Sequence, residues 1–262
     1  MFVYHPYRQA YYITGINYIE LFHNKSGGGK NKLKPEFDFH VKYDKTNREY
    51  TVFIGDRQCC VLVSIDKQNP EKKAVLQIFH YYPTCSITKD LEKGSGTRRM
   101  MRETFRFIKK KFGIKRVILT DKSYILCDSL KETDIENDYA SLNLYKLYLF
   151  THGKPYYVYN FGFRYGSGNS EDDNVDNRKI IKKIKIDDKL IDDLQEKFKK
   201  AKISDEKQKW FFSKLKKTDN IREFIKKYNN KNRCDLFFIL LERLFLLHRI
   251  QDLTGRVYYK DI

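Results

Sequence analysis

The chain of 262 residues carries 52 Lys and Arg against 34 Asp and Glu, which gives a formal net charge of +18. Because 41% of its residues are hydrophobic and 15% are aromatic, the composition excludes a disordered, a collagen-like or a low-complexity protein and predicts one large or two small folded domains. The excess of positive charge favours a polyanionic partner, and nucleic acid, anionic lipid and phosphorylated cofactors all remain open.

The five cysteines show no paired Cys-x-x-Cys spacing, so we expect neither a disulfide framework nor a metal site, and a reducing, cytoplasmic compartment. The first residues lack the basic start and apolar run of a signal peptide. The most apolar segment, 236–247, contains Glu242 and Arg243 and is shorter than the roughly 20 residues that a membrane span needs, so we expect no span.

The first 165 residues show the pattern of a mixed α/β unit with a mostly antiparallel sheet flanked by helices. Period-two alternation and apolar runs predict strands at 37–43, 49–54, 59–65, 74–82, 116–120 and 156–161. The strand at 74–82 is almost continuously apolar, which is typical of a central strand. An apolar stripe predicts a helix over 98–112, and a Leu- and Tyr-rich segment predicts another over 141–151.

The second half of the chain has a different character. Residues 166–177 are rich in Gly, Ser, Asn and acidic side chains, and we expect a flexible linker there. Residues 178–262 then have helical periodicity, which predicts a basic, all-helical C-terminal subdomain. Its expected helices lie near 188–201, 204–217, 219–228 and 234–250, and the last of them is its hydrophobic centre.

A glycine-containing turn separates the central strand from the first long helix. Gly94, Ser95, Gly96 and Thr97 precede Arg98 there. The amide groups at the start of a helix lack internal partners and attract anions, so these five residues are candidates to hold a diphosphate. An ordinary helix-entry turn has the same composition. The Rossmann pattern fails because Arg99 stands at its last glycine position.

The order of these elements resembles that of the GNAT acyltransferase family. Strands come first, then the Gly94–Thr97 turn, an amphipathic helix, the Arg116–Asp121 strand, a second helix and the segment 154–163. Over residues 37–165 the chain is similar to divergent GNAT-like proteins of large cytoplasmic DNA viruses. The resemblance implies that Gly94, Ser95, Gly96, Thr97 and Arg98 bind the pyrophosphate of acetyl-CoA and that Tyr157 protonates the departing thiolate. It also implies a location in the host cytoplasm or in the virion.

Two positions depart from that family. Leu91 stands where the family has Gln or Arg, and the central strand has no Glu in the place of the usual base. His80 or a chain of waters would then have to act as the base. Structural roles are the alternative, since His80 has no acidic neighbour in the sequence and Tyr157 lies among other aromatic residues.

Two segments hold nearly all of the excess positive charge. Residues 93–116 have ten Lys or Arg against one Glu, which gives +9, and residues 178–217 have fifteen against seven acids, which gives +8. In the first segment the candidates for binding nucleic acid or another anionic surface are Arg99, Arg102, Arg106, Lys109 and Lys110. A solvated helix face would show the same pattern.

Three functions therefore remain open. The first is an N-acetyltransferase that transfers an acetyl group from acetyl-CoA to an amine. The second is a GNAT-fold protein without catalysis that serves as a minor capsid or interaction protein with virion proteins as partners. The third is a nucleic-acid-binding accessory protein that uses the basic segments.

Overall fold

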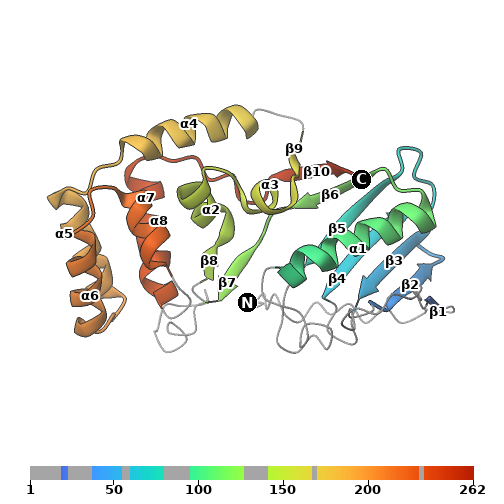
Figure 1. Ribbon diagram of the computed structural model, residues 1–262, viewed down its shortest axis with the longest axis horizontal. Coiled ribbons are helices and arrows are strands. Elements are labelled where there is room, and N and C mark those ends of the chain that lie inside the picture. Colours follow the sequence, from blue (N-terminus) through green and yellow to red (C-terminus); the bar gives the residue numbers. More distant parts are fainter. Residues whose placement is uncertain are drawn as a thin grey trace, which may run out of the picture. The chain divides into compact units, whose positions relative to one another are not determined.

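The computed structural model describes residues 19–22, 37–54, 60–79, 95–126, 141–166, 170–229 and 233–262 (Figure 1). The chain forms a mixed α/β structure that divides into two compact units. The first unit comprises Met1–Leu119 and Lys260–Ile262, and the second comprises Thr120–Tyr259. The division thus falls after residue 119, whereas the sequence predicted a boundary near residue 166.

The first unit is built on a mostly antiparallel sheet. Its strands are β1 (Ile19–Phe22), β2 (Phe39–Asp44), β3 (Glu49–Ile54), β4 (Val61–Asp66), β5 (Lys73–Phe79) and β6 (Arg116–Thr120, of which Thr120 already belongs to the second unit). Neighbouring strands from β1 to β5 pair antiparallel, and β6 pairs with β5 in parallel. The predicted meander and its central strand are confirmed.

The register of this sheet follows from the alternation of apolar residues. Val41, Val52, Val63, Leu76 and Leu119 lie opposite one another on five successive strands, and all five are buried. A shift of one residue in any strand would turn its apolar side chains to the opposite face, so this row fixes the pairing.

Helix α1 (Ser95–Phe112) connects the parallel strands β5 and β6 and lies across one face of the sheet (Figure 1). Its apolar face includes the buried residues Met101, Phe105 and Ile108, as the sequence predicted. Phe107 stacks on Phe39 of β2 with ring centroids 4.2 Å apart. The helix begins three residues earlier than predicted, so the expected turn residues 95–97 form its first turn.

A C-terminal strand that the sequence did not predict, β10 (Val257–Asp261), is present. Its last residues belong to the first unit, where the amide of Ile262 donates to the carbonyl of Lys115 at 2.9 Å. The side chain of Arg116 binds Asp261 at 2.7 Å. The expectation of an all-helical C-terminal subdomain is therefore wrong for the end of the chain.

The second unit is mainly helical. Its elements are β7 (Tyr124–Leu126), β8 (Ser141–Asn143), α2 (Leu144–His152), α3 (Tyr156–Phe161), β9 (Arg164–Tyr165), α4 (Ser170–Lys183), α5 (Asp188–Lys200), α6 (Asp205–Leu215), α7 (Ile221–Tyr228), α8 (Cys234–Leu247) and the first part of β10, which pairs with β9. Helix α8 is buried on most of its surface and is the hydrophobic centre, as predicted.

Two local predictions in this unit are wrong. Residues 156–161 form helix α3 in place of the expected strand, and Gly162 ends this helix in the left-handed conformation (φ 67°) with its amide bonded back to the helix. Tyr156 and Tyr159 pack against Tyr148 of α2, and this packing overrides the strand propensity of the aromatic residues. Residues 170–177, expected as linker, form the first half of α4. The acidic side chains of Glu171, Asp172 and Asp173 lie in its first turn, where the helix dipole favours them.

The cysteine prediction also fails at two positions. Cys60 in the first unit and Cys234 in the second are both disulfide-bonded, and both are buried. The sequence spacing alone did not indicate these bonds. Disulfides follow from spatial proximity, which residue spacing does not report.

Candidate functional site

The start of α1 is the first candidate site. Ser95, Gly96 and Thr97 lie in its first turn, which contains no acidic residue, and Arg98 follows with an exposed side chain. The amide groups of a first turn have no acceptor within the helix, so they and the helix dipole attract an anion. Gly94 and His80, which the sequence also indicated, lie outside the described residues.

Strand β5 extends beyond its parallel neighbour β6 at its carboxyl end. The pairs between β5 and β6 run from Lys73 and Arg116 to Leu76 and Leu119. Strand β5 then continues for three residues, 77–79, beyond its last pair with β6. In α/β sheets ligands bind outside the carboxyl ends of parallel strands. The next described element after this end of β5 is α1, and residues 80–94 between the two lie outside the described ranges.

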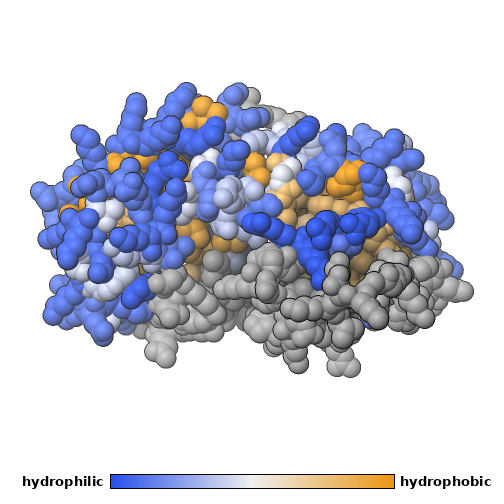
Figure 2. Space-filling view, in the orientation of Figure 1, coloured by the Kyte–Doolittle hydropathy of each residue, from blue (hydrophilic) through white to orange (hydrophobic). Residues whose placement is uncertain are grey.

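The outer face of α1 carries a row of basic side chains. Arg102, Arg106, Lys109 and Lys110 are all exposed, and Figure 2 shows hydrophilic residues along this helix. The only acidic residue of α1, Glu103, forms an ion pair with Arg106. These four residues therefore present a positive surface, as the sequence predicted.

Arg99 differs from the other predicted anion-binding residues. Its side chain is only partly exposed, and its guanidinium lies 5.6 Å from the ring centre of Phe37. A cation over an aromatic face is stabilised by the ring, so part of this side chain serves packing. Arg99 is therefore not one of the fully exposed basic residues of α1.

Tyr157, the predicted general acid, lies in the second unit on helix α3. It is 7% exposed, and its ring contacts those of Phe161 and Phe163. Burial, and then the negative charge of Asp121, raise the pKa of this phenol far above its usual value. The start of α1 belongs to the first unit, so the described structure does not assemble Tyr157 and the cofactor turn within one unit.

A buried polar group that the sequence analysis did not select lies close to Tyr157. Asp121 is 1% exposed, and its Oδ1 accepts hydrogen bonds from the amide and hydroxyl of Ser123 at 3.0 and 2.5 Å. Its Oδ2 and the hydroxyl of Tyr258 are buried and have no hydrogen-bond partner among the described residues. The Asp-x-Ser spacing is the signal that could have indicated this turn.

We expect Asp121→Asn to change the pH dependence of stability. Burial raises the pKa of Asp121 despite the opposing hydrogen bonds from Ser123, so the folded state holds this proton more tightly than the unfolded state. The stability that Asp121 contributes below its unfolded pKa is therefore lost as the pH rises through the folded pKa. Asparagine keeps an acceptor for Ser123 and never ionises, so the variant should be more stable than wild type at neutral pH.

Urea unfolding of the two proteins at several pH values measures this difference. The advantage of the variant should shrink as the pH falls to about 4, where an ordinary Asp begins to protonate. A difference that is the same at every pH, or that grows on acidification, would contradict the assignment.

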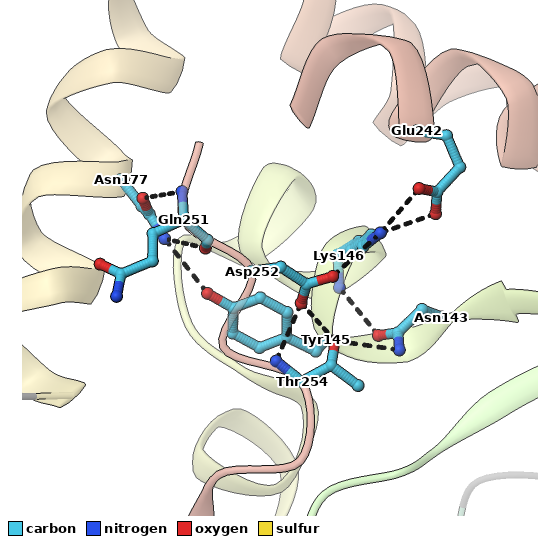
Figure 3. A network of polar contacts seen from close by, with 8 residues as sticks. All are labelled: Asn143, Tyr145, Lys146, Asn177, Glu242, Gln251, Asp252 and Thr254. Atoms are coloured by element: carbon cyan, nitrogen blue, oxygen red, sulfur yellow. Dashed lines mark hydrogen bonds and ion pairs between the residues drawn. The ribbon is translucent and has the colours of Figure 1, made fainter. Parts of the chain in front are cut away.

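A second polar network joins the C-terminal segment to α2, α4 and α8 (Figure 3). The ammonium of Lys146, whose side chain is 10% exposed, lies 2.7 Å from Glu242 and 3.1 Å from Asp252. The side chain of Asn177 donates to the carbonyl of Gln251 and accepts from its amide. Because each of these groups has a partner, the network anchors the segment and offers no reactive group.

Comparison with protein-family profiles, with curated proteins and with solved structures found no match to the chain. Within the described ranges no group of three or more His, Cys, Asp and Glu side chains is arranged to hold a metal ion. No described helix is both long and apolar enough to cross a membrane.

Proposed function

We propose that the first unit binds an acyl-CoA at the amino end of α1, as a GNAT-like protein would. The observation that carries the proposal is the β5–α1–β6 crossover. In it a helix that starts with small residues and no acid follows the carboxyl end of a parallel strand pair. The antiparallel strands β2–β5 that precede the crossover support the same conclusion, since the resemblance implies that order.

The start of α1 and the end of β5 suit two different parts of acyl-CoA, the diphosphate and the pantetheine arm. The amides of residues 95–97 suit the diphosphate, and Arg98 adds positive charge beside them. The backbone of residues 77–79 continues beyond the last pair with β6. An extended pantetheine arm with its amide groups suits such a strand end, because an extended ligand can add to a sheet by main-chain hydrogen bonds.

Acetyl transfer would follow from binding by attack of an amine on the thioester carbonyl. A C–N bond forms, the C–S bond breaks, and the CoA thiolate takes up a proton while the amine loses one. The chain would contribute mainly orientation of the two reactants. Because Tyr157 is buried and its pKa is strongly raised, it is a poor proton donor. We therefore propose acyl-CoA binding, and acetyl transfer needs an experiment of its own.

Thermal unfolding with acetyl-CoA tests the proposal. A ligand that binds only the folded state should raise the melting temperature progressively, with about 2.7 kcal/mol of stabilisation at a hundred times the Kd. In Gly96→Glu the shift should be lost, because a carboxylate in the first turn repels the diphosphate. The same carboxylate interacts favourably with the helix dipole, so folding should be preserved.

Thr46→Glu is the matched control. Thr46 lies in an exposed turn of the first unit, between β2 and β3. Tyr50 of β3 packs against Phe112 at the carboxyl end of α1, so the substitution adds the same charge away from the amino end of that helix. This variant should keep the full response to acetyl-CoA. Absence of any shift in wild type at millimolar acetyl-CoA, or an equal loss in both variants, would overturn the proposal. Release of free thiol from acetyl-CoA in the presence of an amine would add transfer to binding.

A further inference from the structure

Helices α2 and α3 carry a group of aromatic rings on the surface of the second unit. Gly153, in the left-handed conformation, and Pro155 join the two helices closely. We call Tyr148, His152, Tyr156 and Tyr159 the aromatic surface. Tyr148 stacks on His152 with centroids 4.8 Å apart, and His152 lies 4.0 Å from Tyr159. Tyr156 meets Tyr148 edge to face at 5.0 Å.

These rings differ from the aromatic residues of the core. Tyr159 is 49% exposed and His152 is also exposed, whereas Tyr145 and Phe150 on the same helix α2 are fully buried. Large aromatic side chains that remain in contact with water while they contact one another offer ring faces to a planar ligand. The aromatic surface is therefore a candidate binding surface.

The charge around the aromatic surface is positive. No Asp or Glu occurs between residues 139 and 170, so α2 and α3 contain no carboxylate. Desolvation, and then the charges of Lys226 and Arg222 on α7, lower the pKa of His152. The Nε of Arg222 donates to the carbonyl of Phe150 at 2.8 Å, which holds α7 beside α2. Lys154, between α2 and α3, is exposed.

We propose that the aromatic surface stacks the bases of single-stranded nucleic acid, with Lys154, Arg222 and Lys226 neutralising its phosphates. Stacking needs accessible rings, and the phosphates need positive charge close by. The rings of this surface are accessible, α2 and α3 hold no carboxylate, and Lys154, Arg222 and Lys226 outnumber Glu223, the one acidic residue of α7. A duplex hides the faces of its bases, so single strands fit better. This inference concerns the second unit and is independent of acyl-CoA binding by the first.

Fluorescence anisotropy of a labelled oligo(dT) with the full chain tests the inference. Tyr159→Ala should weaken binding about tenfold, because stacking on one ring contributes on the order of 1–3 kcal/mol, and Tyr159→Phe should bind as wild type. Lys226→Ala should lower the slope of log affinity against log salt by about 0.7, as expected for one lost phosphate contact.

The matched control is Tyr124→Ala, which removes another exposed tyrosine of the same unit, 43% accessible and on strand β7. It should leave the affinity unchanged. Heparin, an anion without bases, separates stacking from charge, and Tyr159→Ala should not affect its binding.

Three results would overturn the inference. The first is that Tyr159→Ala and His152→Ala, with melting temperatures close to wild type, bind oligo(dT) as tightly as wild type. The second is that duplex DNA binds at least as tightly as oligo(dT) and that Tyr159→Ala weakens both equally. The third is that only the double variant Arg102→Ala/Arg106→Ala loses binding, which would place the nucleic acid on α1.

Discussion

Replacement of Phe211 by alanine should destabilise the second unit by about 3–5 kcal/mol, the usual loss for a large aromatic side chain in a close-packed core. The ring of Phe211 is fully buried and meets four others edge to face, one of them that of its neighbour Phe212 at 5.4 Å. Its centroid lies 4.9 Å from that of Phe198, 5.0 Å from Phe224 and 6.2 Å from Phe237. Removing it leaves a cavity among rings contributed by α5, α7 and α8.

The fluorescence of Trp210, the single tryptophan of the chain, measures this effect in urea. Trp210 also lies on α6, so its signal reports the unfolding of the second unit. The neighbouring Phe212 is only partly buried, and Phe212→Ala should therefore cost distinctly less. Equal losses for the two variants, or a loss below about 1 kcal/mol for Phe211→Ala, would contradict this account of the core.

Lys207→Met should cost roughly 3 kcal/mol, because it leaves a buried carboxylate without its counter-ion. Asp235 is 1% exposed in the first turn of α8, and the ammonium of Lys207 lies 2.6 Å from its Oδ2. Its Oδ1 accepts from the amide of Leu236. Methionine keeps most of the aliphatic side chain of lysine, so the loss reports charge rather than packing.

A double-mutant cycle isolates the cause of that loss. Asp235→Asn removes the negative charge and retains an acceptor for Leu236, so it should be milder than Lys207→Met. In the double variant no unpaired charge remains, and much of the loss caused by Lys207→Met should be recovered. Additive losses in urea unfolding would show that the ion pair is not the reason.

The elements that the sequence predicted well are those whose pattern is local. Alternating apolar residues indicated strands β2 to β5, and one apolar stripe indicated α1, because burial of one face imposes each period. The polar residues that begin the later helices, such as Asp187 and Asn220, accept hydrogen bonds from the first turn as cap residues do.

The elements that the sequence did not indicate depend on distant residues. Strand β10 is held by Lys115 and Arg116, which are far away in the chain. Helix α3 is rich in residues that favour strands, and its conformation follows from packing against α2. No local pattern reports such contacts.

Part of the candidate site was accessible to sequence reasoning. The exposed basic row Arg102, Arg106, Lys109 and Lys110 was predicted and is present, whereas Tyr157 is buried. Acyl-CoA binding stays a prediction. The aromatic surface was missed because its rings come from two helices, one of which was expected as a strand. The absence of Asp and Glu from residues 139–170 is the sequence feature that could have indicated this surface.

The return of residues 260–262 to the first unit has a consequence for synthesis of the chain. The ribosome makes these residues only after the whole of the second unit, Thr120–Tyr259, has been translated. Domains commonly fold from the amino end as they emerge. Here the sheet, although it is made first, must wait for closing residues that follow directly on Tyr259, the last residue of the helical unit, and a fragment that stops at residue 119 would lack them.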